Sequence, residues 1–67
     1  MEIDDLRALT DDELSEDLDN SRMELMNLRF RVATMQLPNV NEIRRVRKRI
    51  ARVLTVMRQR ELARAAE

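Results

Sequence analysis

The chain has 67 residues, and its 13 basic and 13 acidic side chains cancel to a formal net charge of zero. It contains no Cys and no His, which excludes disulfides and the usual zinc ligands. A metal held by carboxylates alone stays formally open, but acids in a first helical turn are usually solvated, so neither a metal nor a cofactor is expected. Because it has no Gly, one Pro and one aromatic residue, the composition disfavours a sheet protein and favours an all-α fold in a single domain, 1–67. No apolar run approaches the ~20 residues of a membrane span, and no signal peptide is expected because the N-terminus is acidic.

The N-terminal segment, 1–9, predicts a short extra element. Its apolar residues Ile3, Leu6 and Leu9 recur at every third position, so a brief helix would bring them to one face. We expect this helix to fold back on the rest of the chain, because an apolar face that short gains little unless it is covered.

The first long helix is expected over 10–36. Thr10 and Glu13 form a capping box, in which the Thr hydroxyl accepts from the Glu amide and the Glu side chain reaches back. Along the helix, apolar residues alternate spacings of four and three, which is typical of a coiled-coil seam with one small polar interruption. The seam comprises Leu14, Leu18, Ser21, Leu25, Leu28, Val32 and Met35.

A turn at 37–39 is predicted by Pro38, which cannot continue a helix interior. Asn39 and Glu42 repeat the capping arrangement and begin a second long helix, expected over 40–64. Its seam comprises Ile43, Val46, Ile50, Val53 and Met57. Two long helices joined by a turn this short must lie antiparallel, so we predict a coiled-coil-like helical hairpin.

Some apolar residues fall partly or wholly off these seams: Met23, Met26, Phe30, Leu54, Val56 and Leu62. One interpretation is that Met26, Phe30 and Leu54 widen the contact between the two helices. The other is that some of them face a partner protein, because exposed apolar stripes usually mark interfaces.

The charges are sorted along the chain. Residues 1–20 hold nine acids and one base, whereas residues 42–64 hold nine bases and two acids. Six bases lie within nine residues: Arg44, Arg45, Arg47, Lys48, Arg49 and Arg52. In the hairpin, 22–52 form a closed end with nine bases against two acids, a net charge of +7. The remaining residues form an open end with eleven acids against four bases, a net charge of −7.

Five of the six bases are expected on the arc of the second helix that faces away from its seam: Arg44, Arg45, Lys48, Arg49 and Arg52. A solvated basic face with local salt bridges is one interpretation, but the acids lie beside the other end of this helix. Phosphate binding is favoured, because five of the six bases are Arg, which grips phosphate bidentately. With one aromatic residue, stacking on single-stranded bases is disfavoured. Duplex or folded RNA fits better, although charge alone leaves DNA open. No catalytic residues are expected, because the chain lacks Cys, His and Tyr.

Three stretches resemble the bacterial large-subunit ribosomal protein twenty-nine family. The run LMNLRFRVAT, 25–34, followed by Gln-Leu, resembles the family's first-helix signature, and NVNEIRRVRKRIAR, 39–52, resembles its second. LRALTDDEL, 6–14, is similar to the family's start, so the likeness covers nearly the whole chain. The family often has Gly where this chain has Met35, so we expect the first helix to run further before it turns.

The resemblance implies a non-enzymatic, cytoplasmic, ribosome-bound protein that is monomeric when isolated. It further implies that the chain binds large-subunit ribosomal RNA near the polypeptide exit tunnel. Its implied neighbour is large-subunit ribosomal protein twenty-three, with trigger factor and the signal recognition particle nearby. The residues expected to contact RNA are Arg29, Arg31, Asn39, Asn41, Arg44, Arg45, Arg47, Lys48, Arg49 and Arg52.

Two other functions remain open at this point. The seams would also suit a coiled-coil interaction module that dimerises without binding RNA. The opening IDDLRAL has a superficial likeness to a small helical mutase of the chorismate mutase sort, in which Arg residues bind a dicarboxylate. That fold needs a third substantial helix, which 67 residues barely supply.

Overall fold

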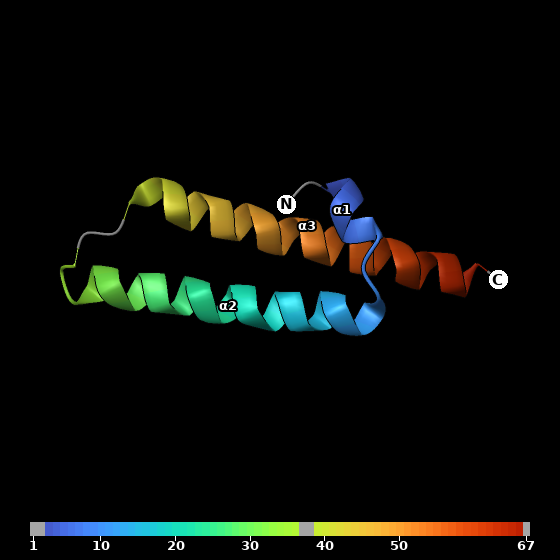
Figure 1. The fold of residues 1–67 in the computed structure, drawn as a ribbon, viewed down its shortest axis with the longest axis horizontal. Helices are drawn as coiled ribbons and strands as arrows, with labels where there is room; N and C mark the ends of the chain where they lie inside the picture. Colours follow the sequence, from blue (N-terminus) through green and yellow to red (C-terminus); the bar gives the residue numbers. More distant parts are fainter. Residues whose placement is uncertain (1–2, 37–38, 67) are drawn as a thin grey trace.

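The computed structural model describes residues 3–36 and 39–66, which form two long antiparallel helices and a short one (Figure 1). Helix α1 spans Ile3–Arg7, α2 spans Asp11–Ala33 and α3 spans Val40–Ala65. The molecule is a rod with extents of 50 × 17 × 16 Å. The predicted all-α hairpin with a short N-terminal helix is therefore confirmed. The predicted break at Pro38 lies outside the described residues.

Helix α2 begins at the predicted cap. Thr10 has an extended backbone, and its hydroxyl oxygen accepts from the Glu13 amide at 3.2 Å. The same hydroxyl donates to the Glu13 carboxylate at 3.1 Å, so the Glu side chain does turn back toward the cap. The three acids of the first turn, Asp11 to Glu13, lie at the positive end of the helix dipole.

Helix α2 ends at Ala33, three residues before the expected bound. Met35 adopts a left-handed backbone with φ of 61°. Its amide donates to the Val32 carbonyl at 3.0 Å, and the Gln36 amide donates to the Arg31 carbonyl at 2.8 Å. These two bonds are the Schellman pattern, which usually has Gly at the left-handed position. The expectation that Met replaces Gly by extending the helix is wrong, because Met35 takes the glycine conformation instead.

Helix α3 begins after Asn39, whose side chain accepts from the Asn41 amide at 2.9 Å. The sequence predicted a box with Glu42, but the Glu42 amide donates to the Asn39 main-chain oxygen at 3.0 Å instead. The cap is therefore present at the predicted residue, with its side-chain bond one residue earlier than expected.

The hydrophobic core lies in the open end, where three helices meet. Its buried members are Leu6, Leu14, Leu18, Val53 and Val56, with Ile3, Leu9, Ile50 and Met57 partly buried around them. Helix α1 lies against α3, on the side away from α2 in Figure 1. Leu6 is fully buried and Val56, which is off the predicted seam, is 1% exposed. The predicted fold-back of the N-terminal segment therefore supplies part of the core.

The closed end has a much thinner core. Leu28 and Val46 are each 6% exposed, but Val32, the next seam residue, is 52% exposed. The seam pattern therefore extends beyond the packing it predicted. Half of the rod is a compact three-helix unit, and the basic half is an arm of two helices that projects from it.

The apolar residues off the seams have different fates. Met26 and Phe30 are 66% and 65% exposed, and Leu54 is 41% exposed. The interpretation that these three widen the contact between the helices is therefore wrong. They remain on the surface, as the partner interpretation requires.

Candidate nucleic-acid interface

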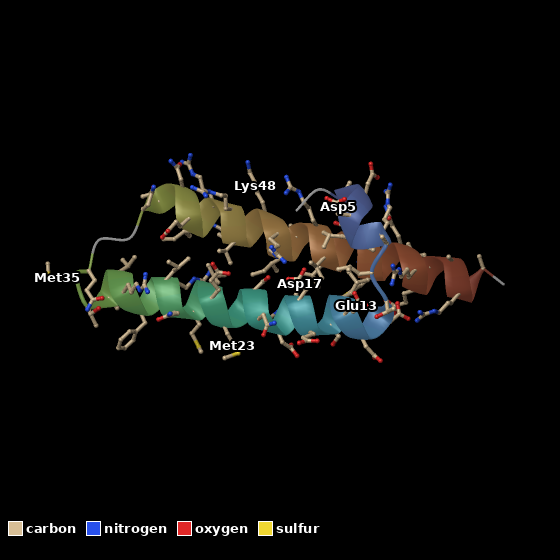
Figure 2. The ribbon with its side chains drawn as sticks, viewed as in Figure 1. Asp5, Glu13, Asp17, Met23, Met35 and Lys48 are labelled. Carbon is tan, nitrogen blue, oxygen red and sulfur yellow. The ribbon has the colours of Figure 1, made fainter. Side chains whose placement is uncertain are left out.

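The outward face of α3 carries a compact group of exposed bases. Because Val46 and Val53 turn inward and are buried, the helical period sends Arg44, Arg45 and Lys48 outward, and all three are exposed. Figure 2 shows Lys48 pointing away from α2. Arg47 is also exposed, and with Arg44 and Lys48 it lines one open hollow. We call Arg44, Arg45, Arg47 and Lys48 the basic face.

Within the described residues, no ion pair joins the basic face to an acid. Like charges at helical spacings of three and four repel by a few tenths of a kcal/mol per pair. Phosphate oxygens at the hollow would relieve this repulsion, and guanidinium groups can bind them with paired hydrogen bonds.

Arg49 faces α2, not the outward arc on which the sequence placed it. Its Nε and Nη2 both lie 2.9 Å from Oδ1 of Asp17, whose side chain is only 12% exposed. The Ser21 hydroxyl, in a residue 2% exposed, donates to the same oxygen at 3.3 Å. This three-residue network ties α2 to α3 and explains the small polar interruption in the seam. The expectation that all acids of the open end lie away from the cluster is wrong for Arg49.

Arg52 is half-buried and is engaged by other groups of the chain. It lines a second hollow with Arg45, Lys48 and Arg49, together with Glu24 and Val46. A row of bases four residues apart, Arg44, Lys48 and Arg52, therefore runs from solvent into the body of the rod.

The remaining predicted residues lie around the closed end. Arg29 and Arg31 are exposed on α2, and Asn41 is exposed on the first turn of α3. Asn39 is exposed, but its side-chain oxygen is occupied by the cap. The structure thus brings four bases together on one helix and leaves the other candidates on the flanks of the arm.

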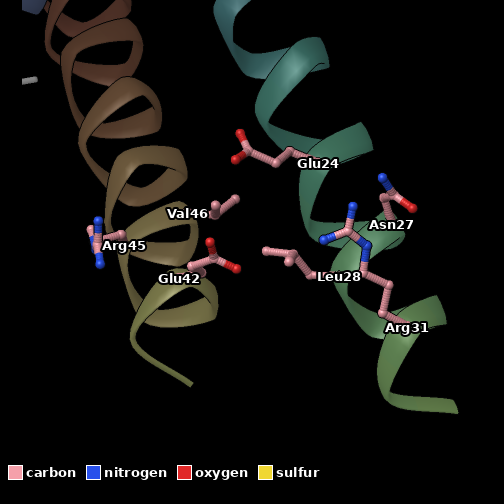
Figure 3. Close-up of a pocket in the computed structure, with 7 residues that line it drawn as sticks. All are labelled: Glu24, Asn27, Leu28, Arg31, Glu42, Arg45 and Val46. Carbon is pink, nitrogen blue, oxygen red and sulfur yellow. The ribbon is translucent and has the colours of Figure 1, made fainter. Parts of the chain in front are cut away.

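The groove between α2 and α3 at the closed end is a poor site for phosphate. Figure 3 shows Glu24 from α2 and Glu42 from α3 at this groove, with Val46 from α3 facing it. In that view the guanidinium of Arg45 lies on the side of α3 away from α2. Glu24 and Glu42 stand against Arg31 and Arg45 in the lining of this groove, so the groove has no excess of positive charge, unlike the hollow on the outward face of α3.

Asp11 in the open end is paired with bases of α3, a pairing that the antiparallel arrangement predicted only in outline. Asp11 forms ion pairs with Arg60, at 2.8 Å, and with Arg64. Hydrogen bonds from Arg60 and then Arg64 lower the pKa of the Asp11 carboxyl below its ordinary value of 3.8. Arg60 also donates to the main-chain oxygens of Arg7, at 3.0 Å, and Leu9. Arg60 was not singled out from sequence, although antiparallel pairing places residue 60 opposite residue 11.

Comparison with known proteins decides the family. Residues 4–60 match the family described as "Ribosomal L29 protein". The chain belongs to the ribosomal L29 protein family. The resemblance found in the sequence is thereby confirmed, and the match includes both long helices up to Arg60 and the whole basic face.

Curated relatives of this L29 family member are more than half identical to it over the aligned residues. It is 58% identical over 62 residues to the large ribosomal subunit protein uL29 of Mycobacterium avium, covering 92% of this chain and 80% of that protein. The protein of the same name from Mycolicibacterium smegmatis is 56% identical over 62 residues, with the same coverage. That of Mycobacterium tuberculosis is 57% identical over 58 residues, covering 87% and 75%.

Residues 3–36 and 39–66 of this L29 family member show neither a membrane span nor a metal-binding cluster. In these residues no helix has the length and apolar character to cross a membrane. The same residues contain no cluster of three or more His, Cys, Asp or Glu side chains arranged to hold a metal ion.

Proposed function

We propose that this chain is a structural, non-enzymatic component of the large ribosomal subunit that binds large-subunit ribosomal RNA through the basic face. The observation that carries the proposal is the gathering of Arg44, Arg45, Arg47 and Lys48 on one outward surface without an internal counter-ion among the described residues. By family, the proposed place is near the polypeptide exit tunnel of cytoplasmic ribosomes. Its proposed neighbours are large-subunit ribosomal protein twenty-three, trigger factor and the signal recognition particle.

The physics of the basic face suits RNA that is recognised by its backbone. Each phosphate neutralised by Lys or Arg releases condensed counterions, which makes the affinity fall with salt. The basic face contains no aromatic side chain on which a base could stack, and the one aromatic residue, Phe30, is on α2. Duplex or folded RNA, read through shape and phosphates, is therefore the proposed ligand class.

The rival function, a coiled-coil module that dimerises, has lost its main support. The seam residues Leu14, Leu18 and Leu28 of α2 are buried within the chain, as are Val46 and Val53 of α3. A zipper with a second copy would need these same surfaces, because the two seams already face each other.

A salt titration tests the proposal. Binding of the purified chain to large-subunit ribosomal RNA is measured at KCl concentrations from roughly 50 to 300 mM, because phosphate contacts make the affinity salt-dependent. Replacing all four bases of the basic face by Gln should weaken binding and reduce the slope of log affinity against log salt by about 3, from ~0.7–0.9 per lost phosphate contact. The same variant should fail to co-sediment with large subunits.

The matched control uses single exposed bases of α3. Lys48→Gln should reduce the slope of log affinity against log salt by ~0.7–0.9, the value for one lost phosphate contact. Arg58→Gln, at the open end, should leave the slope unchanged. Circular dichroism must first show that each variant is folded. If the fourfold variant keeps its affinity and slope, RNA binds elsewhere and the proposal is wrong.

A further inference from the structure

The surface of α2 that faces away from α3 carries a second regular stripe, which we call the outer stripe. Its residues alternate spacings of four and three: Asp12, Glu16, Asp19, Met23, Met26 and Phe30. This spacing keeps the six side chains on one face of the helix, and all six are exposed. Figure 2 shows Met23 pointing away from α3, on the opposite side of the rod from Lys48. The outer stripe and the basic face therefore lie on opposite sides of the rod.

The second half of the outer stripe is apolar. Met23, Met26 and Phe30 are 64%, 66% and 65% exposed, and together with Glu24 and Asn27 they line an open hollow. Three large apolar side chains at positions i, i+3 and i+7 match the anchor spacing by which a helix binds another helix. Methionine is also the apolar residue that adapts best to varied partner surfaces.

The first half of the outer stripe is acidic. Asp12, Glu16 and Asp19 are exposed, and they take no part in the ion pairs among the described residues. Two acids of α2 on the side toward α3, by contrast, are paired with bases of α3: Asp11 with Arg60 and Asp17 with Arg49. The outer stripe is thus an apolar patch continued by two turns of negative charge.

We propose that the outer stripe docks an amphipathic helix of a partner protein, with apolar side chains over Met23, Met26 and Phe30. The partner helix continues with Lys or Arg side chains over the acidic half. Charge complementarity supports a partner helix with basic residues at this end, because the acidic half of the outer stripe repels a helix that carries acids there. The inference goes beyond the proposed function, because it concerns the face of the rod that points away from the basic face.

Charge and area argue against the other occupants. A second copy laid parallel would place Asp12, Glu16 and Asp19 against their own counterparts. An antiparallel copy centred on Met26 would bury little beyond three side chains per chain, well short of the ~800 Å² per partner of a standard interface. RNA and anionic membranes are repelled by the acidic half.

The probe is a synthetic amphipathic helix of about six turns. It carries Leu at the three stripe positions of one half and Lys at the three stripe positions of the other. A matched peptide has Glu in place of Lys. Binding of each labelled peptide to the full chain is measured by fluorescence anisotropy at low and high salt. We expect the Lys peptide to bind at least tenfold more tightly than the Glu peptide, and salt to narrow the difference.

Variants of the chain locate the site. The double substitution Met26→Gln and Phe30→Gln should lower the affinity of the chain for the Lys peptide at least tenfold. Reversing Asp12, Glu16 and Asp19 to Lys should exchange the preference, so that the Glu peptide binds more tightly. The control is Leu62→Gln, which changes an apolar residue 60% exposed on α3 and should alter affinity less than twofold. All these positions are exposed, so circular dichroism should show folded variants.

Four outcomes would overturn the inference. The first is no binding of the Lys peptide at millimolar concentration, and the second is equal binding of the two peptides. The third is that sedimentation shows concentration-dependent self-association of the chain, and that the double variant Met26→Gln and Phe30→Gln abolishes it. The fourth is loss of RNA affinity in that variant as large as in the basic-face variant. Failure of RNA binding alone would overturn the proposed function and leave this inference standing.

Discussion

Replacing Met35 by Gly should stabilise the protein. Met35 has φ of 61°, and the left-handed region costs an L-residue with a β-carbon about 1–2 kcal/mol. Met35 is 86% exposed, so removal of its side chain loses little packing. Gly opposes this gain through the larger entropy of its unfolded chain, about 0.4–1 kcal/mol. The net gain should be about 0.5–1 kcal/mol.

Urea and thermal unfolding followed by circular dichroism measure this gain. At about 4–8 °C per kcal/mol for a domain of this size, Tm should rise by about 2–8 °C. Met35→Ala keeps the β-carbon and should give no increase. Met26→Gly, in the interior of α2, should destabilise by about 1 kcal/mol. A loss of stability in Met35→Gly similar to that of Met26→Gly would refute the reasoning, because it would mean that position 35 is helical.

Three further predictions concern the ion pairs. Arg49→Met should lower the free energy of unfolding in urea by about 1–3 kcal/mol. This is less than the roughly 3–5 kcal/mol for one partner of a fully buried ion pair, because the Asp17 and Arg49 side chains are 12% and 37% exposed. Adding Asp17→Asn should restore part of the loss, and strictly additive losses would contradict an interaction between the two side chains. The pKa of Asp11 is lowered in the folded chain by Arg60 and Arg64, so its contribution is present above the unfolded value of 3.8 and is lost as pH falls below it. Between pH 5 and pH 2 the Tm of Asp11→Asn should therefore fall less than that of the parent chain, and parallel curves would contradict this. Arg60→Met removes the donors to the α1–α2 connection, so amide exchange in α1 should speed up while exchange in the middle of α3 stays unchanged; uniform acceleration would mean global destabilisation instead.

The hairpin was predictable because its signals are local. Caps at Thr10 and Asn39 and a seam with helical period each depend on residues a few positions apart. The burial of Val56 and the hydrogen bonds from Arg60 to the main chain of Arg7 and Leu9 were not predictable in the same way. Both depend on where α1 packs against α3. The end of α2 was missed for a different reason. The hydrophobic period continues through Met35, so the pattern gives no stop signal, whereas the backbone turns at a residue that rarely adopts this conformation.

For the candidate interface, the sequence predicted which helix carries the basic cluster but not which of its bases are exposed and which contact α2. Spacing alone treats Arg45, Lys48 and Arg49 as one arc. In three dimensions Arg49 reaches Asp17 across the hairpin, at the border between seam and surface. Long side chains at such borders can turn either way, and the choice depends on which residue the other helix places opposite them. That pairing depends on register, which the described structure supplies and a single sequence does not.

The two ends of the rod divide stability and recognition between them. The three-helix core and the ion pairs of Asp11 lie in the open end, so the fold does not depend on the closed end being covered. Among the described residues of the closed end, the buried apolar side chains are Leu28 and Val46, and exposed surfaces lie beside them. Because the basic face and the apolar half of the outer stripe lie on opposite sides of this arm, one ligand need not displace the other. Under both proposals, RNA and a partner helix should bind the same chain together, and each should leave the other's affinity nearly unchanged.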